Sequence, residues 1–201
     1  MRPRALIGVV AVLFVVSAGR AILTADHDRD DRDHGRPGEI FDRDDDPRVR
    51  IGFKYAHDQG IKLDLRHKDK DVVGLGSYLV NAVGGCNDCH TNPPYTKNPY
   101  AGLGAPKQIN NACYLNGGVQ FGPFVSRNIT PEHGQPAGLT FEQFKHVIRT
   151  GEDPDNPGQL LQVMPWPVYQ TMIDSDLRAI YEYLSSIPSI PEGHCPPPPM
   201  P

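Results

Sequence analysis

The chain has 201 residues, which suffice for one domain of ordinary size. Its formal net charge of -4 is small, and the basic residues form no stripe or cluster, so the composition excludes a nucleic-acid-binding function. Its 20 glycines and 21 prolines predict a chain that is rich in loops without being wholly disordered.

The N-terminus predicts export from the cytoplasm. Arg2 and Arg4 precede an uninterrupted apolar run, and residues 16–18 (Val-Ser-Ala) form a small-residue cleavage site. This is the pattern of a signal peptide over residues 1–18. The alternative is an uncleaved membrane anchor over residues 1–23, which would place Arg20 in the apolar segment at an energetic cost.

Residues 19–50 are mainly Asp, Arg, His and Glu, and they predict a charged flexible spacer. A metal-binding or partner-binding tail that uses His27 and His34 is the alternative. Residues 51–71 form an N-terminal extension of the following domain, and residues 191–201 form a proline-rich tail outside the core.

Three segments have helical periodicity. In residues 72–84, Leu75, Leu79 and Val83 share one face. Residues 140–150 begin with a capping box formed by Thr140 and Gln143 and end at Gly151. Residues 174–187 present an apolar face, with Asp174 as the expected cap and Pro188 after the end.

Residues 91–138 lack helical periodicity and are rich in Pro, Gly and Asn, with a short hairpin expected around residues 116–118. The expected fold is therefore all-α, with three or more helices and long irregular loops. A bound group that supplies core surface would explain a loop of this length in a compact domain.

Cys86-Asn87-Asp88-Cys89-His90 is the motif that carries chemistry. Two thiols one helical turn apart can form thioether bonds to haem vinyl groups, while the adjacent imidazole binds iron. A thioredoxin-type redox pair or half of a zinc site are the alternatives. No βαβ pattern surrounds the motif, and Cys113 and Cys195 are isolated, so the spacing favours one covalently bound haem c.

Haem iron in an electron carrier needs a second axial ligand. Met164 lies between Val163 and Pro165, where a rigid backbone could direct its sulfur toward iron, and Met172 is the rival. A histidine is the other option, and the candidates are His57, His67, His133, His146 and His194.

Residues 72–188 resemble the class I c-type cytochrome family, and in particular the cytochrome c subunits of bacterial periplasmic dehydrogenases. The segments that carry the resemblance occur in the family's order: residues 76–80, 86–90, 128–131, 139–144, 164–167 and 176–184. The chain departs from many such subunits because it has one Cys-x-x-Cys-His motif.

The resemblance implies a cytochrome c-like haem domain over residues 72–190, in which His90 is the proximal ligand and Met164 the distal ligand. It also implies a contact between the first and last helices at Gly76 and Tyr181, and a haem contact for Trp166 in the Met-Pro-Trp-Pro segment.

Further expectations concern the surroundings of the haem. Asn128 and Thr130, together with Arg127, could bind its propionates, although turn chemistry explains the same residues equally well. A carbonyl of Pro93 or Pro94 could accept a hydrogen bond from His90. Cys113 and Cys195 could form a disulfide in an exported protein.

The function expected from these features is single-electron transfer between periplasmic or membrane redox partners, such as a dehydrogenase, an oxidase or other cytochromes. The chain would not itself be an enzyme, although it could be a subunit of an oxidoreductase complex. A haem enzyme or sensor with an open sixth site is the alternative. Membrane association is expected only if the N-terminal segment stays uncleaved.

Overall fold

The computed structural model describes residues 46–97 and 108–195, which belong to one compact unit. The expected signal peptide or anchor and most of the expected spacer therefore lie outside the described residues. Among the helices that are described, none is long and apolar enough to cross a membrane.

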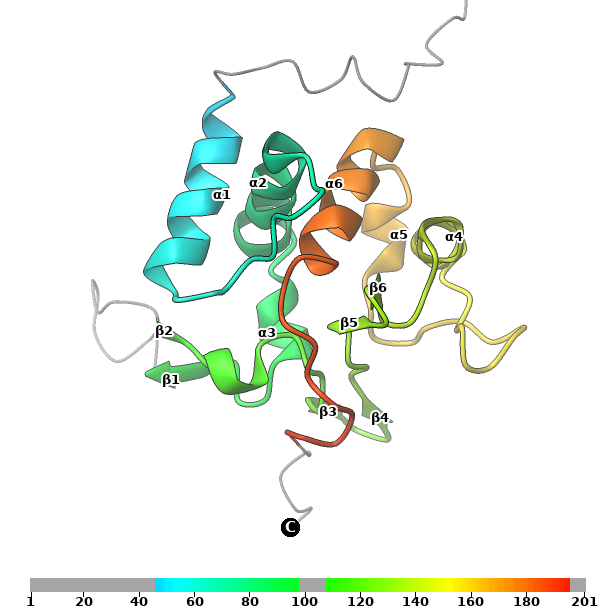
Figure 1. Cartoon of the computed structure of the whole chain (residues 1–201). Helices are drawn as coiled ribbons and strands as arrows, with labels where there is room; N and C mark the ends of the chain where they lie inside the picture. The colour runs from blue at the N-terminus through cyan, green and yellow to red at the C-terminus, as the bar shows by residue number, and fades with distance from the viewer. Residues whose placement is uncertain (1–45, 98–107, 196–201) are drawn as a thin grey trace, which may run out of the picture. The chain divides into compact units, whose positions relative to one another are not determined.

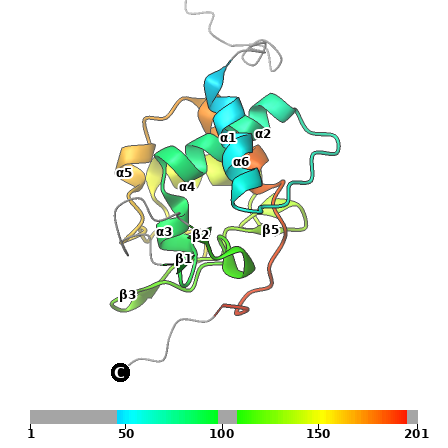
Figure 2. The same ribbon diagram turned by 90° about the vertical axis from the view of Figure 1, so that its left-hand side faces the viewer.

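The described part is rich in helices. Its α-helices are α1 (Pro47–Asp58), α2 (Lys70–Tyr78), α3 (Cys86–His90), α4 (Phe141–Thr150), α5 (Trp166–Tyr169) and α6 (Asp174–Leu184). A π-helix, η1 (Leu79–Val83), continues α2, and η2 (Asn111–Cys113) is a 3-10 turn. Helices α1, α2 and α6 lie side by side, with α3 below them in both views (Figures 1 and 2).

Short antiparallel strand pairs lie in the irregular part of the chain. They are β1 (Tyr95–Lys97) with β2 (Gln108–Ile109), β3 (Gln120–Phe121) with β4 (Phe124–Val125), and β5 (Pro131–Glu132) with β6 (Gln135–Pro136). The architecture is thus helical with small added sheets, which the all-α expectation did not include. The expected hairpin at residues 116–118 is wrong, because the β3–β4 turn falls at Gly122-Pro123 instead.

Helix α1 begins inside the segment that was expected to be a spacer. Its N-cap is Asp46, whose side chain accepts a hydrogen bond from the Arg48 amide. The helix packs directly on α2 at Gly52, where a Cβ atom would come within 2.0 Å of the Gly74 carbonyl oxygen. The Ser77 hydroxyl also donates to the Gly52 carbonyl at 2.8 Å, so α1 is an integral part of the helical layer.

Helices α2 and α6 cross at a second close backbone contact. A Cβ atom on Gly76 would lie 2.0 Å from the Ala179 carbonyl oxygen and 2.6 Å from the Tyr183 Cβ. The expected contact of Gly76 with Tyr181 is wrong, because the Tyr181 ring packs edge-on against Phe141 and Phe144 of α4. Tyr181 lies two residues from each of the real contacts and faces the other side of α6.

The three predicted helices are present. Helix α4 has the expected capping box of Thr140 with Gln143, and Gly151 ends it. Helix α6 begins differently: Ile173 is the N-cap, and no side chain caps the helix. The expected cap, Asp174, instead forms ion pairs with Arg149 at 2.7 Å and Lys145 at 3.4 Å, which join α6 to α4.

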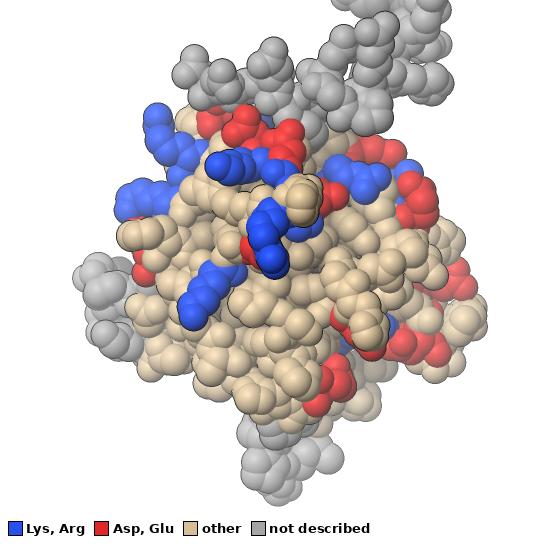
Figure 3. Space-filling model, in the orientation of Figure 1, with Lys and Arg blue, Asp and Glu red and all other residues tan. Residues whose placement is uncertain are grey.

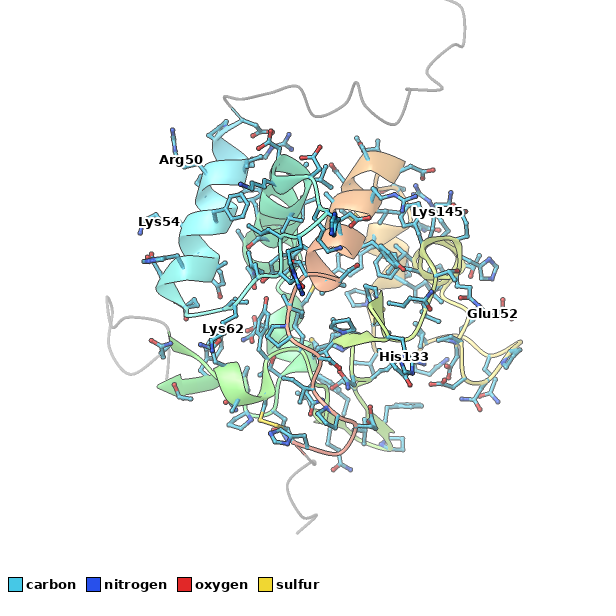
Figure 4. All side chains as sticks on the ribbon, in the orientation of Figure 1. Arg50, Lys54, Lys62, His133, Lys145 and Glu152 are labelled. Carbon is cyan, nitrogen blue, oxygen red and sulfur yellow. A yellow bond between two sulfur atoms is a disulfide. The ribbon has the colours of Figure 1, made fainter. Side chains whose placement is uncertain are left out.

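The C-terminal segment is more ordered than expected as far as the structure describes it. Cys195 is only 8% exposed and forms a disulfide with Cys113, with a Cα–Cα distance of 5.8 Å. Figure 4 shows this bond between the last described segment and the green loop that precedes β3. Cys195 is therefore part of the folded unit, while residues 196–201 lie outside the described part.

Candidate haem-attachment site

Both cysteines of the motif lie on helix α3. They are three residues apart, which places them about one turn apart on the same side of the helix. Neither is joined to another cysteine. The π-helix η1 leads directly into this segment, and such helices are frequent at functional sites. The local chain therefore presents two free thiols and the imidazole of His90 from a single short helix.

The His90 ring is held in one orientation by a backbone carbonyl. Its Nδ1 lies 2.8 Å from the carbonyl oxygen of Arg127. Because a carbonyl only accepts hydrogen bonds, Nδ1 carries the proton and Nε2 keeps a free lone pair. Burial lowers the pKa of His90 and outweighs the hydrogen bond to Arg127, which acts in the opposite direction. The lowered pKa favours the neutral imidazole, which is the form that binds metals.

The expected acceptors, Pro93 and Pro94, are wrong. The Pro93 carbonyl accepts from the side-chain amide of Asn110, and the Pro94 carbonyl accepts from the side-chain amide of Asn87. The true acceptor lies 37 residues beyond His90. It is a backbone atom, so the pattern of side chains gives no signal for it.

The chemistry of the donor set distinguishes the three alternatives for the motif. Burial raises the pKa of Cys86 to about 12 and also raises that of Cys89. A thioredoxin-type pair relies on a lowered thiol pKa, which is the opposite. The remaining two cysteines are joined to each other and cannot complete a zinc site, and the described residues contain no group of three or more metal-binding side chains. Two free thiols beside an imidazole with an available Nε2 fit haem c.

The segment that contains Met164 is attached beside the cysteines. The Tyr169 hydroxyl donates to the Gly84 carbonyl at 3.0 Å, and burial together with the nearby thiols of Cys86 and Cys89 raises the pKa of Tyr169. At the other end, the Leu161 amide donates to the Gly151 carbonyl at 2.8 Å. The structure thus brings the Met-Pro-Trp-Pro segment next to the helix that carries the motif.

The individual residues of this segment have distinct environments. The indole ring of Trp166 covers Gly151, where a Cβ atom would come within 2.2 Å of the ring. Met164 and Met172 are both half-buried. The choice of Met164 over Met172 as distal ligand stays a prediction, as does a haem contact for Trp166.

Large apolar side chains are exposed in the segments that lead to the motif and to Tyr169. Val83, three residues before Cys86, is 61% exposed, and Val168, next to Tyr169, is 68% exposed. Leu160 and Val163, which precede Met164 in the chain, are also exposed. A flat apolar macrocycle attached at the cysteines would bring apolar surface close to Val83, which is near them in the chain.

Asn128 and Thr130 contact the C-terminal segment. The Asn128 side-chain amide donates to the Ile190 carbonyl at 2.8 Å, and its Oδ1 accepts from the Thr130 amide and hydroxyl. The Ile190 amide donates to the Thr130 hydroxyl at 3.1 Å. Propionate binding by these two residues stays a prediction, and Arg127 forms an ion pair with Asp155.

The five histidines considered as alternative iron ligands are all exposed. His146 pairs with Glu152 at 2.8 Å, and His57 lies 3.4 Å from Asp58. Figure 4 shows His133 and Glu152 on the same side of the molecule as Lys145 of α4. The structure thus places all five at the surface, and a methionine as the second iron ligand stays a prediction.

The charged surface is mixed on the face that Figure 3 shows, with basic and acidic side chains interspersed. Several ion pairs join charged side chains of the described residues, among them Lys54–Asp58 at 2.5 Å, Arg66–Asp64 at 2.6 Å and Lys68–Glu182 at 3.0 Å. Opposite charges that pair in this way cancel locally.

The comparisons with known proteins point in the same direction as this site. The chain is 30% identical over 117 residues to the fructose dehydrogenase cytochrome subunit of Gluconobacter japonicus. The matched stretch is 56% of this chain and 20% of that protein. The chain is 31% identical over 113 residues to the gluconate 2-dehydrogenase cytochrome c subunit of Pantoea cypripedii (56% and 22%). It is 27% identical over 124 residues to the alcohol dehydrogenase (quinone) cytochrome c subunit of Gluconobacter oxydans (60% and 25%).

The class that these matches support is the cytochrome c family. The relatives are cytochrome subunits of bacterial dehydrogenases, and the matched part spans about a fifth to a quarter of their length. No family model matches the chain, and no solved structure matches it.

Proposed function

We propose that this chain is a mono-haem c-type cytochrome that transfers single electrons between redox proteins. One haem c would be bound by thioether bonds to Cys86 and Cys89. His90 would be the proximal iron ligand and Met164 the distal ligand, with Met172 as the alternative. The chain would serve as an electron carrier and not as the catalytic component of the reaction.

The observation that supports this proposal best is the state of the His90 ring. Its Nδ1 is fixed by the Arg127 carbonyl at 2.8 Å, which leaves Nε2 available on a residue adjacent to a free thiol. A hydrogen bond of this kind fixes the tautomer and the ring orientation that a metal-binding imidazole needs. Haem, when bound, would supply a ferric/ferrous couple, and two protein ligands would close the iron to other molecules.

The dehydrogenases of the relatives indicate the class of partner. Each relative is the cytochrome subunit of a dehydrogenase that acts on fructose, gluconate or an alcohol. We propose by analogy that a dehydrogenase donates electrons to this chain, and that an oxidase or another cytochrome accepts them. The Cys113–Cys195 disulfide supports a location outside the cytoplasm, because such bonds persist in oxidising compartments.

The first experiment is to express the full chain in a periplasm that attaches haem, and to measure its mass and its oxidised and reduced absorption spectra. The proposal predicts one covalent haem per chain and a low-spin spectrum with the near-infrared band of methionine-sulfur ligation. Met164→Ala should abolish this band and Met172→Ala should retain it. The reverse result would assign Met172 as the ligand.

Cys86→Ala with Cys89→Ala is the control for attachment, and it should give protein without covalent haem. A wild-type protein that carries no haem would refute the proposed function. A high-spin spectrum that changes with carbon monoxide or peroxide would instead favour the haem enzyme or sensor with an open sixth site.

A further inference from the structure

The last described residues, 190–195, form a strap over two loops of the chain. We call these residues the C-terminal strap, and the loops are the 114–118 loop and the 126–130 loop. In Figure 1 the strap is the red segment that runs down beside the green loops. The same two loops hold His90, so the strap and the proposed haem ligand share their supports.

The strap is joined to the 114–118 loop by hydrogen bonds and by a covalent bond. Asn116 is buried, and its Oδ1 accepts from the Cys195 amide at 3.1 Å. Its Nδ2 donates to the Ile190 carbonyl at 3.2 Å and the Pro191 carbonyl at 3.1 Å. The disulfide joins Cys195 of the strap to Cys113, the residue immediately before the 114–118 loop.

The strap is joined to the 126–130 loop through Ile190. Its carbonyl accepts from the Asn128 side-chain amide at 2.8 Å, and its amide donates to the Thr130 hydroxyl at 3.1 Å. Thr130 is 2% exposed, so water cannot easily replace this hydroxyl.

His90 is held between the two loops. The Gly117 amide donates to the His90 carbonyl at 2.7 Å, and the Arg127 carbonyl accepts from the His90 Nδ1 at 2.8 Å. The loops are also bonded to each other, because the Gly118 amide donates to the Ser126 carbonyl and the Ile129 amide to the Leu115 carbonyl, both at 2.9 Å. Movement of either loop would therefore alter the bond to the His90 ring.

We propose that the C-terminal strap, locked by the Cys113–Cys195 disulfide, fixes the Arg127 carbonyl against His90 and thereby sets the reduction potential of the haem. Asn116 and Thr130 are positioning residues in this arrangement, since they act through the loops and not on the iron. This inference rests on the proposed haem function.

The direction of the effect follows from the hydrogen bond. A carbonyl that accepts the Nδ1 proton makes the imidazole a stronger electron donor, which favours ferric iron. Loosening the strap weakens this bond and shifts the equilibrium toward ferrous iron, so the reduction potential rises. For a one-electron couple, a tenfold change in this equilibrium corresponds to about 59 mV.

The test compares three variants with the wild type. The first combines Cys113→Ser and Cys195→Ser, the second carries Thr130→Val, and the third, Ser77→Ala, is a matched control. Ser77→Ala removes a buried hydrogen bond between α1 and α2 at 2.8 Å and a long one from the Asn81 side-chain amide at 3.4 Å, neither of which involves the strap. The measurements are the ferric/ferrous equilibrium by redox titration and the solvent-exchange rate of the His90 Nδ1 proton by NMR. The exchange rate is measured in both haem-loaded and haem-free protein.

We expect both strap variants to shift the equilibrium several-fold toward ferrous iron and to speed up Nδ1 exchange, while Ser77→Ala changes neither. Equal values in all variants would overturn the inference, and so would an equal shift in the Ser77→Ala control. If the double serine variant does not fold, Thr130→Val decides. A change in potential confined to Thr130→Val, with unchanged Nδ1 exchange, would assign that residue to the propionates and reject the strap.

Failure of the proposed function has a different signature. Wild-type protein would then carry no covalent haem, while Nδ1 exchange in the haem-free protein would still report whether the strap holds the His90 bond.

Discussion

Three buried side chains behind Cys86 form a closed hydrogen-bonded ring. The Tyr114 hydroxyl donates to the Asn81 Oδ1 at 2.6 Å, and the Asn81 Nδ2 donates to the Tyr183 hydroxyl at 3.2 Å. Since the single Tyr114 proton is already used, the Tyr183 hydroxyl donates to Tyr114 across 2.9 Å. Burial raises the pKa of both tyrosines, so each hydroxyl stays protonated and able to donate.

Tyr183→Phe should lower the free energy of unfolding by about 1–3 kcal/mol, because the Tyr114 oxygen loses its donor in a site that excludes water. Denaturant unfolding measures this change. Tyr181→Phe is the matched control: its hydroxyl donates to the Leu139 carbonyl at 3.0 Å, but the side chain is only partly buried, so water can replace the bond. Equal losses in the two variants would contradict the role assigned to the buried ring.

At the scale of elements, α1 and α6 both approach α2 at glycines. Gly52 of α1 and Gly76 of α2 each leave no room for a Cβ atom, because a backbone carbonyl oxygen of the neighbouring helix would be 2.0 Å away. Such contacts let helices pack with their backbones close together, and they fix where along each helix the crossing occurs. Helix α2, which precedes the Cys86–His90 segment, is thereby held on both sides.

Gly52→Ala tests whether α1 belongs to the core. Alanine favours an isolated helix by about 1 kcal/mol over glycine, but the clash with Gly74 must separate α1 from α2. We expect a net loss of about 1–3 kcal/mol in the free energy of unfolding, measured by denaturant. Ile51→Ala, on the exposed face of the same helix, should change it by less than about 1 kcal/mol. An unchanged or increased stability of Gly52→Ala would show that α1 is dispensable.

For the whole molecule, the disulfide connects positions that are 82 residues apart in the sequence. A cross-link over such a long loop reduces the conformational freedom of the unfolded chain. It also encloses residues 113–195, which include α4, α5 and α6, within one covalent ring. This constraint supplements the apolar core of a fold that is rich in loops.

Cys113→Ser with Cys195→Ser should lower the free energy of unfolding by about 2–5 kcal/mol. The measurement is denaturant unfolding of the variant and of wild-type protein, each with and without reductant. Reductant should destabilise the wild type and leave the variant unchanged. If the wild type and the variant unfold at the same denaturant midpoint without reductant, the disulfide contributes nothing to stability.

Features that depend on neighbours in the chain follow from the sequence alone. The spacing of Cys86, Cys89 and His90 predicts haem attachment within five residues, and this stays a prediction. The periodicity of residues 72–84 and 140–150 predicts two helices, and both are present because helical periodicity and capping act over one or two turns.

The contacts between distant segments become known only from the folded chain. The acceptor for His90 is the Arg127 carbonyl and not a neighbouring proline, Gly76 meets Ala179, and Asp174 pairs with α4 instead of capping its own helix. Each of these depends on which backbone atoms and helix faces are brought together by packing. The Arg127 carbonyl is a backbone atom 37 residues beyond His90, so no side-chain pattern marks it, and the environment of the His90 ring emerges only when the chain is folded.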